Sequence, residues 1–319
     1  MAGGEHGSLG SVRHLTSVDG LSDAELHHLV QRSAWYAGPG AAGVRPLEGC
    51  VVGSFFRTTS TRTRSAFATA ALRLGAGHVA YGPHDLQLNT GESMEDTARV
   101  LGSMLDALVV RTAADPAELR ALLAQNRMAV INAMTADEHP TQAIADLSTI
   151  ELHFGKIAGL RVLYIGEGNN TASALALALS RYANVEFCLA TPPGYGLDSS
   201  FLERARTQAA QRGAQVDEVH DVTEAMEDAD VVYTTRWQTT GTSKADPDWR
   251  TSFLPFQVND ALMHRNPRAV FMHDLPAHRG EEVTPEILDG VSSIAFRQAE
   301  QKMHSAKAVL EWCVRGRPA

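Results

Sequence analysis

Residues 50–74 read CVVGSFFRTTSTRTRSAFATAALRL, and this stretch decides the fold class. The apolar run Cys50–Phe56 predicts a buried strand. Phe67, Ala71 and Leu74 then recur at helical spacing, which predicts that a helix follows the strand. A strand followed by a helix is the repeating unit of a parallel sheet whose faces are covered by helices.

The same alternation extends over the first 135 residues. Further apolar runs predict strands at 106–111 and 128–132. Upstream, Ser22 and Glu25 form the pattern of a capping box, and Leu26, Leu29 and Val30 follow at helical spacing. We therefore expect a parallel sheet in this half of the chain.

The alternation restarts after residue 159. Strands are expected at 161–165, 185–190, 230–233 and 269–272, with an Ala- and Leu-rich helix at 172–180, a bridging helix at 139–154 and a closing helix at 299–314. The predicted fold class is α/β, with two doubly wound parallel-sheet domains of similar size joined by interdomain helices. The chain divides into residues 1–138 and 139–295, with the helix 296–315 packing back on the first domain, and 319 residues suit about two domains.

The composition excludes several classes of protein. Lys and Arg total 28 against 37 Asp and Glu, a net charge of −9, so general binding to nucleic acid or to a membrane surface is not expected. No apolar run reaches the length of a membrane span, and the first residues do not resemble a signal peptide. Cys50, Cys188 and Cys313 are scattered, which argues against a disulfide framework or a zinc knuckle. We expect a cytoplasmic protein whose partners are small molecules.

A phosphate-binding motif is predicted where the strand at 50–56 gives way to its helix. Ser60, Thr61 and Thr63 supply hydroxyls, the helix N-terminus supplies free N–H groups, and Arg62 supplies a fork of donors that matches phosphate oxygens. The Walker glycines are missing, so an ATPase is not indicated. The alternative is a Ser N-cap beside two solvated arginines.

Two further motifs stand at predicted element ends. His139 and Gln142 begin the helix 139–154 and could donate hydrogen bonds to a carbonyl, although a capping His is an equal alternative. His273 and Asp274 end a predicted strand, where open α/β sheets bind ligands. His273 and His278 have no third ligand at a recognised spacing, so no metal is predicted.

The stretch Gly166–Thr171 begins like a dinucleotide fingerprint. Its last position is Thr171 rather than Gly or Ala, and no acidic residue follows the next strand to hold a ribose. We therefore do not expect a dinucleotide cofactor.

Taken together, these residues resemble the aspartate/ornithine carbamoyltransferase family. The resemblance runs from about residue 14 to 312 through STRTR, DTARV, Arg111, HPTQAIAD, GEGNN, HDLPAHRGEEVT and QAEQK, and the last two motifs are closer to ornithine carbamoyltransferases. It implies a homotrimer with shared active sites that transfers carbamoyl from carbamoyl phosphate to an amine without a cofactor. It also implies that the first domain binds carbamoyl phosphate and the second the amino substrate.

Residue roles follow from the resemblance. The carbamoyl phosphate set is Ser60, Thr61, Arg62, Thr63, Arg111, His139, Gln142 and Lys302, with Gln87 reaching in from a neighbouring subunit. The acceptor set is Asn170, Thr235, Arg236, Gln238, Thr239, Asp274 and Leu275. The catalytic set is Arg62, Arg111, His139 and Asp274, because positioned donors stabilise the oxyanion of acyl transfer and a carboxylate could orient or deprotonate the attacking amine.

The acceptor end departs from the family pattern. Asp274 stands where ornithine enzymes carry Cys, Thr235 stands where they carry the Asp that receives the α-amino group, and Lys302 replaces an Arg. Arg57 stands where the family often has Glu. The order of Thr235, Arg236 and Gln238 is similar to aspartate carbamoyltransferases, although the expected mobile-loop Lys is missing.

These departures favour an altered acceptor that keeps a carboxylate, such as a short diamino acid of specialised metabolism. One alternative is an ordinary ornithine carbamoyltransferase. A second is a non-catalytic paralogue that binds phosphorylated ligands and regulates a partner.

Overall fold

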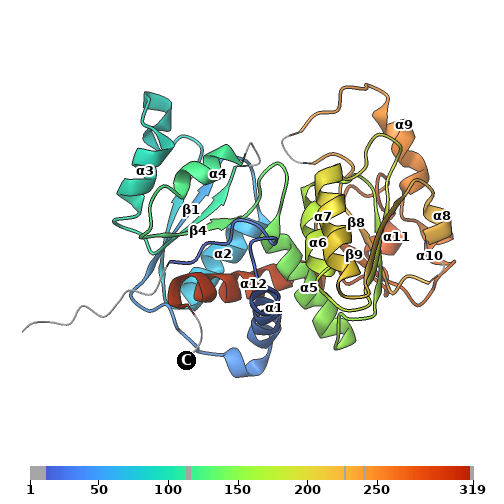
Figure 1. Ribbon diagram of the computed structural model, residues 1–319, viewed down its shortest axis with the longest axis horizontal. Helices are drawn as coiled ribbons and strands as arrows, with labels where there is room; N and C mark the ends of the chain where they lie inside the picture. The colour runs from blue at the N-terminus through green and yellow to red at the C-terminus, as the bar shows by residue number, and fades with distance from the viewer. Residues whose placement is uncertain (1–11, 113–115, 226–227, 240–241, 317–319) are drawn as a thin grey trace, which may run out of the picture.

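The computed structural model describes residues 12–112, 116–225, 228–239 and 242–316, and within these ranges the strands form two parallel sheets lying side by side (Figure 1). The first sheet has the order β2-β1-β3-β4 and the second the order β7-β6-β5-β8-β9. Every strand pair within these sheets is parallel. The predicted α/β class with two doubly wound domains is confirmed.

The first sheet contains the strand that opened the sequence argument. Its strands are β1 (Val51–Phe56), β2 (Gly77–Tyr81), β3 (Ala107–Arg111) and β4 (Ala129–Asn132). The intervening segments form α2 (Arg62–Arg73), η2 (Gln87–Thr90), α3 (Met94–Leu101) and α4 (Ala117–Leu122). Helix α2 begins directly after the loop that leaves β1, as the periodicity predicts.

The second sheet repeats the pattern. Its strands are β5 (Arg161–Ile165), β6 (Glu186–Ala190), β7 (Gln215–Val219), β8 (Val231–Thr234) and β9 (Val270–His273). Its helices are α6 (Asn170–Leu179), α7 (Ser199–Ala210), α8 (Val222–Ala225), α9 (Trp249–Phe253), α10 (Asp260–Met263) and α11 (Pro285–Leu288), with the short turn η3 (Leu254–Phe256).

The sequence analysis missed β2 and β7. Both are edge strands, and most of their residues are exposed or half-buried, so they do not show the continuous apolar run of a central strand. The buried strands β1, β3, β4, β5, β8 and β9 all lie within one residue of their predicted positions.

Three helices form the junction between the sheets: α1 (Asp23–Ala37), α5 (Pro140–Phe154) and α12 (Ala295–Arg315). Helix α5 packs against α1 and α12 on one side and against α6 on the other, and α12 also contacts α2. Eleven consecutive residues of α5, Pro140–Ile150, are buried. A helix that is buried on all sides is surrounded by protein, and its polar side chains therefore need partners within the fold.

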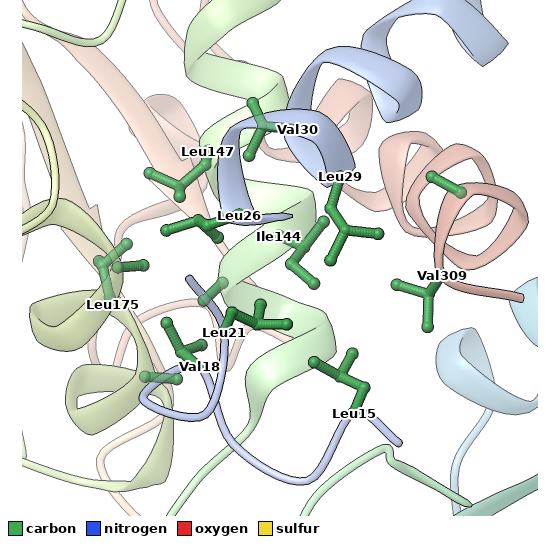
Figure 2. Packing of buried hydrophobic residues seen from close by; sticks show 14 of the residues in the cluster. Leu15, Val18, Leu21, Leu26, Leu29, Val30, Ile144, Leu147, Leu175 and Val309 are labelled. Atoms are coloured by element: carbon green, nitrogen blue, oxygen red, sulfur yellow. The ribbon is translucent and has the colours of Figure 1, made fainter. Parts of the chain in front are cut away.

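Figure 2 shows the core at this junction. Ile144 and Leu147 of α5 lie beside Leu26 and Leu29 of α1, with Val309 of α12 nearby. The segment before α1 adds Leu15, Val18 and Leu21, of which Val18 and Leu21 lie on the side of Leu175 of α6 (Figure 2). One apolar cluster therefore includes residues from both halves of the chain.

A buried cation joins the N-terminal segment to the second domain. The guanidinium of Arg181, which is almost fully buried, donates to the backbone carbonyls of Leu21 and Asp19 and pairs with Asp23 at 3.2 Å. These contacts compensate part of the desolvation of the guanidinium and help to hold the two domains in one arrangement.

The sheet orders determine where ligands can bind. In the first sheet β2 is added on one side of β1, and β3 and β4 are added on the other, so the strand order switches at the β1/β3 pair. In the second sheet the strand order switches at the β5/β8 pair. Open α/β sheets bind ligands outside the carboxyl ends of the strands at such switch points. The fold therefore provides two switch points, and the loops that follow β1, β3, β5 and β8 form their edges. Among the described helices, none is long and apolar enough to cross a membrane.

We predict that Leu147→Ala destabilises the protein by about 3 kcal/mol, because it opens a cavity in the junction core. Leu152 lies on the same helix and is 46% exposed, so Leu152→Ala should change stability by less than about 0.5 kcal/mol. Urea unfolding followed by circular dichroism measures both variants. Equal effects of the two substitutions would contradict the assigned role of this core.

Candidate active site

A pocket of about 240 Å³ lies where the carboxyl ends of the two sheets face each other. It collects residues that follow β1, β3, β4, β5, β8 and β9, together with the start of α5 and one side chain of α12. All but one of the sequence-predicted site residues line it, namely Ser60, Thr61, Arg62, Thr63, Arg111, His139, Gln142, Asn170, Thr235, Arg236, Gln238, Thr239, Asp274, Leu275 and Lys302.

Gln87 is the exception. It lies in η2, outside this pocket, where its side-chain oxygen accepts a hydrogen bond from Thr90 at 3.0 Å. Arg57 also lies outside the pocket and pairs with Glu118 at 3.0 Å. The Glu expected near position 57 is thus replaced by a cation that has its own carboxylate partner.

The predicted phosphate motif forms one end of the pocket. Thr61 is the N-cap residue of α2, but neither it nor Ser60 caps the helix through its side chain, so the Ser N-cap alternative does not describe this loop. The first-turn N–H groups of α2 and the positive end of its dipole are therefore available to an anion. Thr63 is buried one residue into the helix and accepts a long hydrogen bond, 3.4 Å, from Arg111.

Three cations share this end of the pocket. Burial lowers the pKa of Arg111 to about 10 and that of Lys302 to about 8, and burial also lowers the pKa of Arg62. The Nε atoms of Arg62 and Arg111 are buried and lack a hydrogen-bond partner in the described ranges. Buried donors of this kind call for an anionic ligand, because their desolvation is otherwise uncompensated.

His139 is the N-cap of α5 and is buried. In the structure its side chain makes no capping bond to the described helix, so the capping alternative does not apply. Burial holds the pKa of His139 well below its ordinary value, and the nearby charges of Arg111 and Lys302 act in the same direction. A neutral imidazole can donate one hydrogen bond to a ligand oxygen without adding charge.

Gln142 corrects one prediction. Its amide nitrogen donates to Asp146 at 2.7 Å, while its carbonyl oxygen is buried and has no partner in the described part of the chain. The assignment of O and N follows from the carboxylate, which needs a donor. Gln142 therefore presents an acceptor to the pocket, which suits an N–H group of a ligand rather than a carbonyl.

The orientation of Gln142 depends on a buried polar network. Asp146, fully buried on α5, also accepts hydrogen bonds from Gln298 at 2.7 Å and from the Tyr233 hydroxyl at 3.1 Å. Burial raises the pKa of Asp146 to about 7. Gln298 in turn accepts from the backbone N–H of His273 at 2.8 Å, so α5, β8, β9 and α12 are joined beneath the pocket.

Asp274 also lines the pocket, near enough to Lys302, Arg62 and Arg111 to interact with their charges. Its carboxylate accepts hydrogen bonds from the hydroxyls of Thr235 at 2.9 Å and Thr171 at 3.1 Å. Burial opposes ionisation, but the neighbouring His273, Lys302 and Thr235 together hold the pKa of Asp274 below its ordinary value. The carboxylate is therefore charged at neutral pH and is a weak base, which suits holding a cation better than removing a proton.

His273, the residue before Asp274, is itself held in place by hydrogen bonds. His273 is fully buried, accepts from the Leu275 backbone N–H through Nδ1 at 2.8 Å and faces Glu282 through Nε2 at 3.0 Å. The nitrogen that faces Glu282 is therefore the protonated one. His278 faces a different carboxylate, Glu281, at 3.6 Å.

Asn170 connects the two halves of the site. Its side-chain amide donates to the Thr135 backbone carbonyl at 2.7 Å, and its backbone carbonyl accepts from the His139 backbone N–H at 3.1 Å. Part of its donor capacity is thus already used within the protein.

Several lining residues were not predicted, namely Thr59, Met134, Asn169, Thr171 and Pro276. Asn169 and Thr171 flank Asn170, and Met134 follows a buried strand. They would have been found if every residue in the loop after each predicted strand had been taken as a candidate, because ligands bind at the carboxyl ends of the strands.

Comparisons with known proteins agree with this geometry. Residues 13–152 match the family model described as aspartate/ornithine carbamoyltransferase, carbamoyl-P binding domain, and residues 158–313 match the Asp/Orn binding domain. These ranges meet after α5, whereas the sequence analysis divides the chain before it. Helix α5 packs on both halves, so it belongs to the junction.

Relatives and solved structures extend the likeness over the whole chain. An ornithine carbamoyltransferase of Thermococcus kodakarensis is 41% identical over 83% of this chain and 84% of its own, and one of Symbiobacterium thermophilum is 38% identical over 93% and 96%. The structure of ornithine carbamoyltransferase from Pyrococcus furiosus superposes with a TM-score of 0.90 at 36% identity, covering 97% of this chain and 99% of its own.

We predict that inorganic phosphate binds the cationic end and that its affinity falls as Lys302 loses its proton. With a pKa of about 8 for Lys302, affinity for the dianion should be about tenfold weaker at pH 9 than at pH 7. Calorimetric titration across this range measures it. Lys302→Arg keeps its charge, so its affinity should stay nearly constant, and an equal decline in both proteins would contradict the assignment.

Proposed function

The chain belongs to the aspartate/ornithine carbamoyltransferase family, and on that premise we propose that it transfers the carbamoyl group of carbamoyl phosphate to the side-chain amine of ornithine. One observation carries the proposal. The pocket combines a cluster of cations, fit for a phosphate dianion, with the charged carboxylate of Asp274, fit for an ammonium group.

The cationic end suits carbamoyl phosphate. The α2 N-terminus, Arg62 and Lys302 match the phosphate, and Arg111 with neutral His139 can donate to the carbonyl oxygen as it gains negative charge. The Gln142 oxygen can accept from the carbamoyl NH₂ group. Each of these groups is already held by the fold, so little reorganisation accompanies the reaction.

The bond changes are those of acyl transfer. The neutral amine attacks the carbonyl carbon, a tetrahedral oxyanion forms, and the C–O bond to phosphate breaks with its electron pair leaving on oxygen. The amine proton can pass to the departing phosphate, so no side chain of low basicity, Asp274 included, has to remove it.

The acceptor end suits ornithine through a relocated carboxylate. The family's Asp is replaced by Thr235, but the Asp274 carboxylate lies 2.9 Å from the Thr235 hydroxyl. Negative charge is thus retained at nearly the same place, on a different strand end. We assign it to the α-ammonium group of ornithine, with Asn170 and Arg236 near the α-carboxylate. The names of the relatives support ornithine as the acceptor.

A second candidate acceptor is a shorter diamino acid. It is favoured by the same Thr235–Asp274 contact, because the carboxylate available to an α-ammonium group comes from position 274 and not from position 235, where ornithine enzymes carry it. The non-catalytic alternative gains no support, since every member of the predicted transfer set except Gln87 lines one pocket.

We further propose a homotrimer with shared sites in a reducing, cytoplasmic compartment. The free thiols of Cys50, Cys188 and Cys313 are compatible with that compartment. Gln87 lies outside the pocket of its own chain, as a residue that serves a neighbouring subunit would.

The acceptor proposal is tested with an amine panel of ornithine, 2,4-diaminobutyrate, 2,3-diaminopropionate and aspartate, read by mass spectrometry. Ornithine should have the highest kcat/KM. Asp274→Asn should lower kcat/KM for ornithine about 10–100-fold, because a charge-assisted contact is lost, without raising the KM for carbamoyl phosphate. Asp217→Asn on the exposed edge strand β7 is the matched control and should behave as wild type.

A charge relocation sharpens the test. Asp274→Cys alone should lose ornithine activity, and adding Thr235→Asp should restore at least about a tenth of it, since the two positions are coupled. A wild-type preference for one of the shorter diamino acids would transfer the proposal to the second candidate. No transfer to any amine would refute both.

Assembly is tested by sedimentation and by mixing subunits. The protein should sediment at about three times its chain mass of 34.4 kDa. Gln87→Ala and Arg62→Ala should each lose activity by about 10²-fold, as expected when a stabilising donor is lost. Hybrids of the two variants should regain activity, because some sites then receive both side chains. A fully active monomer is the contrary result.

A further inference from the structure

Lys244 lies in the loop between β8 and α9, next to the acceptor end of the pocket but outside its lining. Its side chain is only 5% exposed, and its ammonium group pairs with the carboxylate of Glu167. A lysine with so little exposure to solvent is uncommon, because desolvation of its charge must be compensated by partners.

Aromatic rings supply the remaining partners. The Lys244 Nζ lies 4.8 Å from the ring centre of Tyr195, 5.0 Å from that of Phe253 and 5.2 Å from that of Trp249. These distances are those of cation–π contacts, which are strongest where the cation is desolvated. Trp237, buried against Phe253, completes this aromatic cluster.

The cluster joins segments that are far apart in the sequence. Tyr195 lies in the loop after β6, where its carbonyl accepts from the Gly168 backbone N–H at 2.8 Å, and Trp249 and Phe253 belong to α9. Trp237 stands between the pocket residues Thr235 and Thr239. The ammonium group of Lys244 is the charge at the centre of this arrangement.

A chain of hydrogen bonds leads from Lys244 into the pocket. Glu167, besides its ion pair with Lys244, accepts a long hydrogen bond from the Thr239 hydroxyl at 3.5 Å. That hydroxyl accepts from the Asn169 amide at 3.1 Å, and the Asn169 side-chain oxygen caps α6. Thr239 and Asn169 both line the acceptor end of the pocket.

We propose that Lys244 is a positioning residue for the acceptor: its caged ammonium group holds Glu167, and through it Thr239 and Asn169, in the geometry that the acceptor meets. The proposal rests on the carbamoyl transfer proposed above. The role belongs to the acceptor only, because the contacts of Lys244 lead to the residues after β5 and β8 and not to the α2 N-terminus or Arg111.

The kinetic test uses Lys244→Met, which keeps the length of the side chain and removes its charge. The KM for the best amine of the panel should rise about tenfold, because the loss of one desolvated cation contact weakens binding by about that factor. The kcat and the KM for carbamoyl phosphate should change less than about threefold. Lys156 is exposed, and Lys156→Met is the matched control with wild-type constants expected. An unchanged acceptor KM, or an equal rise of both KM values, overturns the proposal.

A double variant separates positioning from simple charge. Lys244→Met leaves the Glu167 carboxylate without its cation beside the pocket, whereas Lys244→Met combined with Glu167→Gln removes both charges. If Lys244 positions Thr239 and Asn169, the double variant stays impaired. Recovery of the wild-type acceptor KM would mean that only an uncompensated carboxylate was harmful, and would overturn the proposal.

A labelling experiment does not depend on turnover. In the wild-type protein, acetylation by a water-soluble reagent, followed by peptide mass spectrometry, should modify Lys244 at least about tenfold more slowly than Lys156, and Glu167→Gln should reduce that protection. Equal rates at Lys244 and Lys156 overturn the caged geometry. If no amine in the panel is carbamoylated, the proposed function is refuted. The labelling rates still test whether Glu167 and the aromatic rings enclose the Lys244 ammonium group.

Discussion

Burial of helix α5 between the helices of the two sheets is the packing on which the rest of the structure depends. Its first residues carry His139 and Gln142 into the pocket, and its next turn carries Asp146, which orients Gln142 from below. Because the helix is enclosed by α1, α12 and α6, its N-terminus cannot shift without disturbing cores on both sides. Rigid support of this kind is what keeps catalytic groups in place before a ligand binds.

The pocket contains buried charged groups, and the desolvation of each costs free energy. At one end Arg62, Arg111 and Lys302 have lowered pKa values, and two of their Nε donors are unmet in the described ranges. Beside them a carboxylate, Asp274, is kept ionised by His273, by Lys302 and by a hydroxyl, and Lys302 also donates to its backbone carbonyl at 2.9 Å. Lys302 thus stands between the arginines and Asp274, and a ligand that carries both an anionic and a cationic group can interact with both kinds of charge.

In the acceptor site proposed above, the carboxylate differs from the family pattern in its position more than in its chemistry. Thr235 has no charge, yet its hydroxyl touches the carboxylate that Asp274 supplies from the next strand. Lys244 and Glu167 form a second pair of charges next to the pocket, and aromatic rings surround the Lys244 ammonium group. The structure therefore accounts for Thr235 and Asp274 together, because the two side chains meet in space.

The sequence by itself determined the α/β class, the buried strands and most of the site. Buried parallel strands such as β1 have continuous apolar runs, and the STRTR motif contains donors whose types alone indicate phosphate. The edge strands β2 and β7 were not predicted, because strands that are not buried on both faces have no such run. Only the tertiary structure decided which way Gln142 turns, that Asp274 meets Thr235 across 39 positions, and that Lys244 is caged. These features depend on side chains brought together by the packing of separate elements, and no local pattern of residues records such contacts.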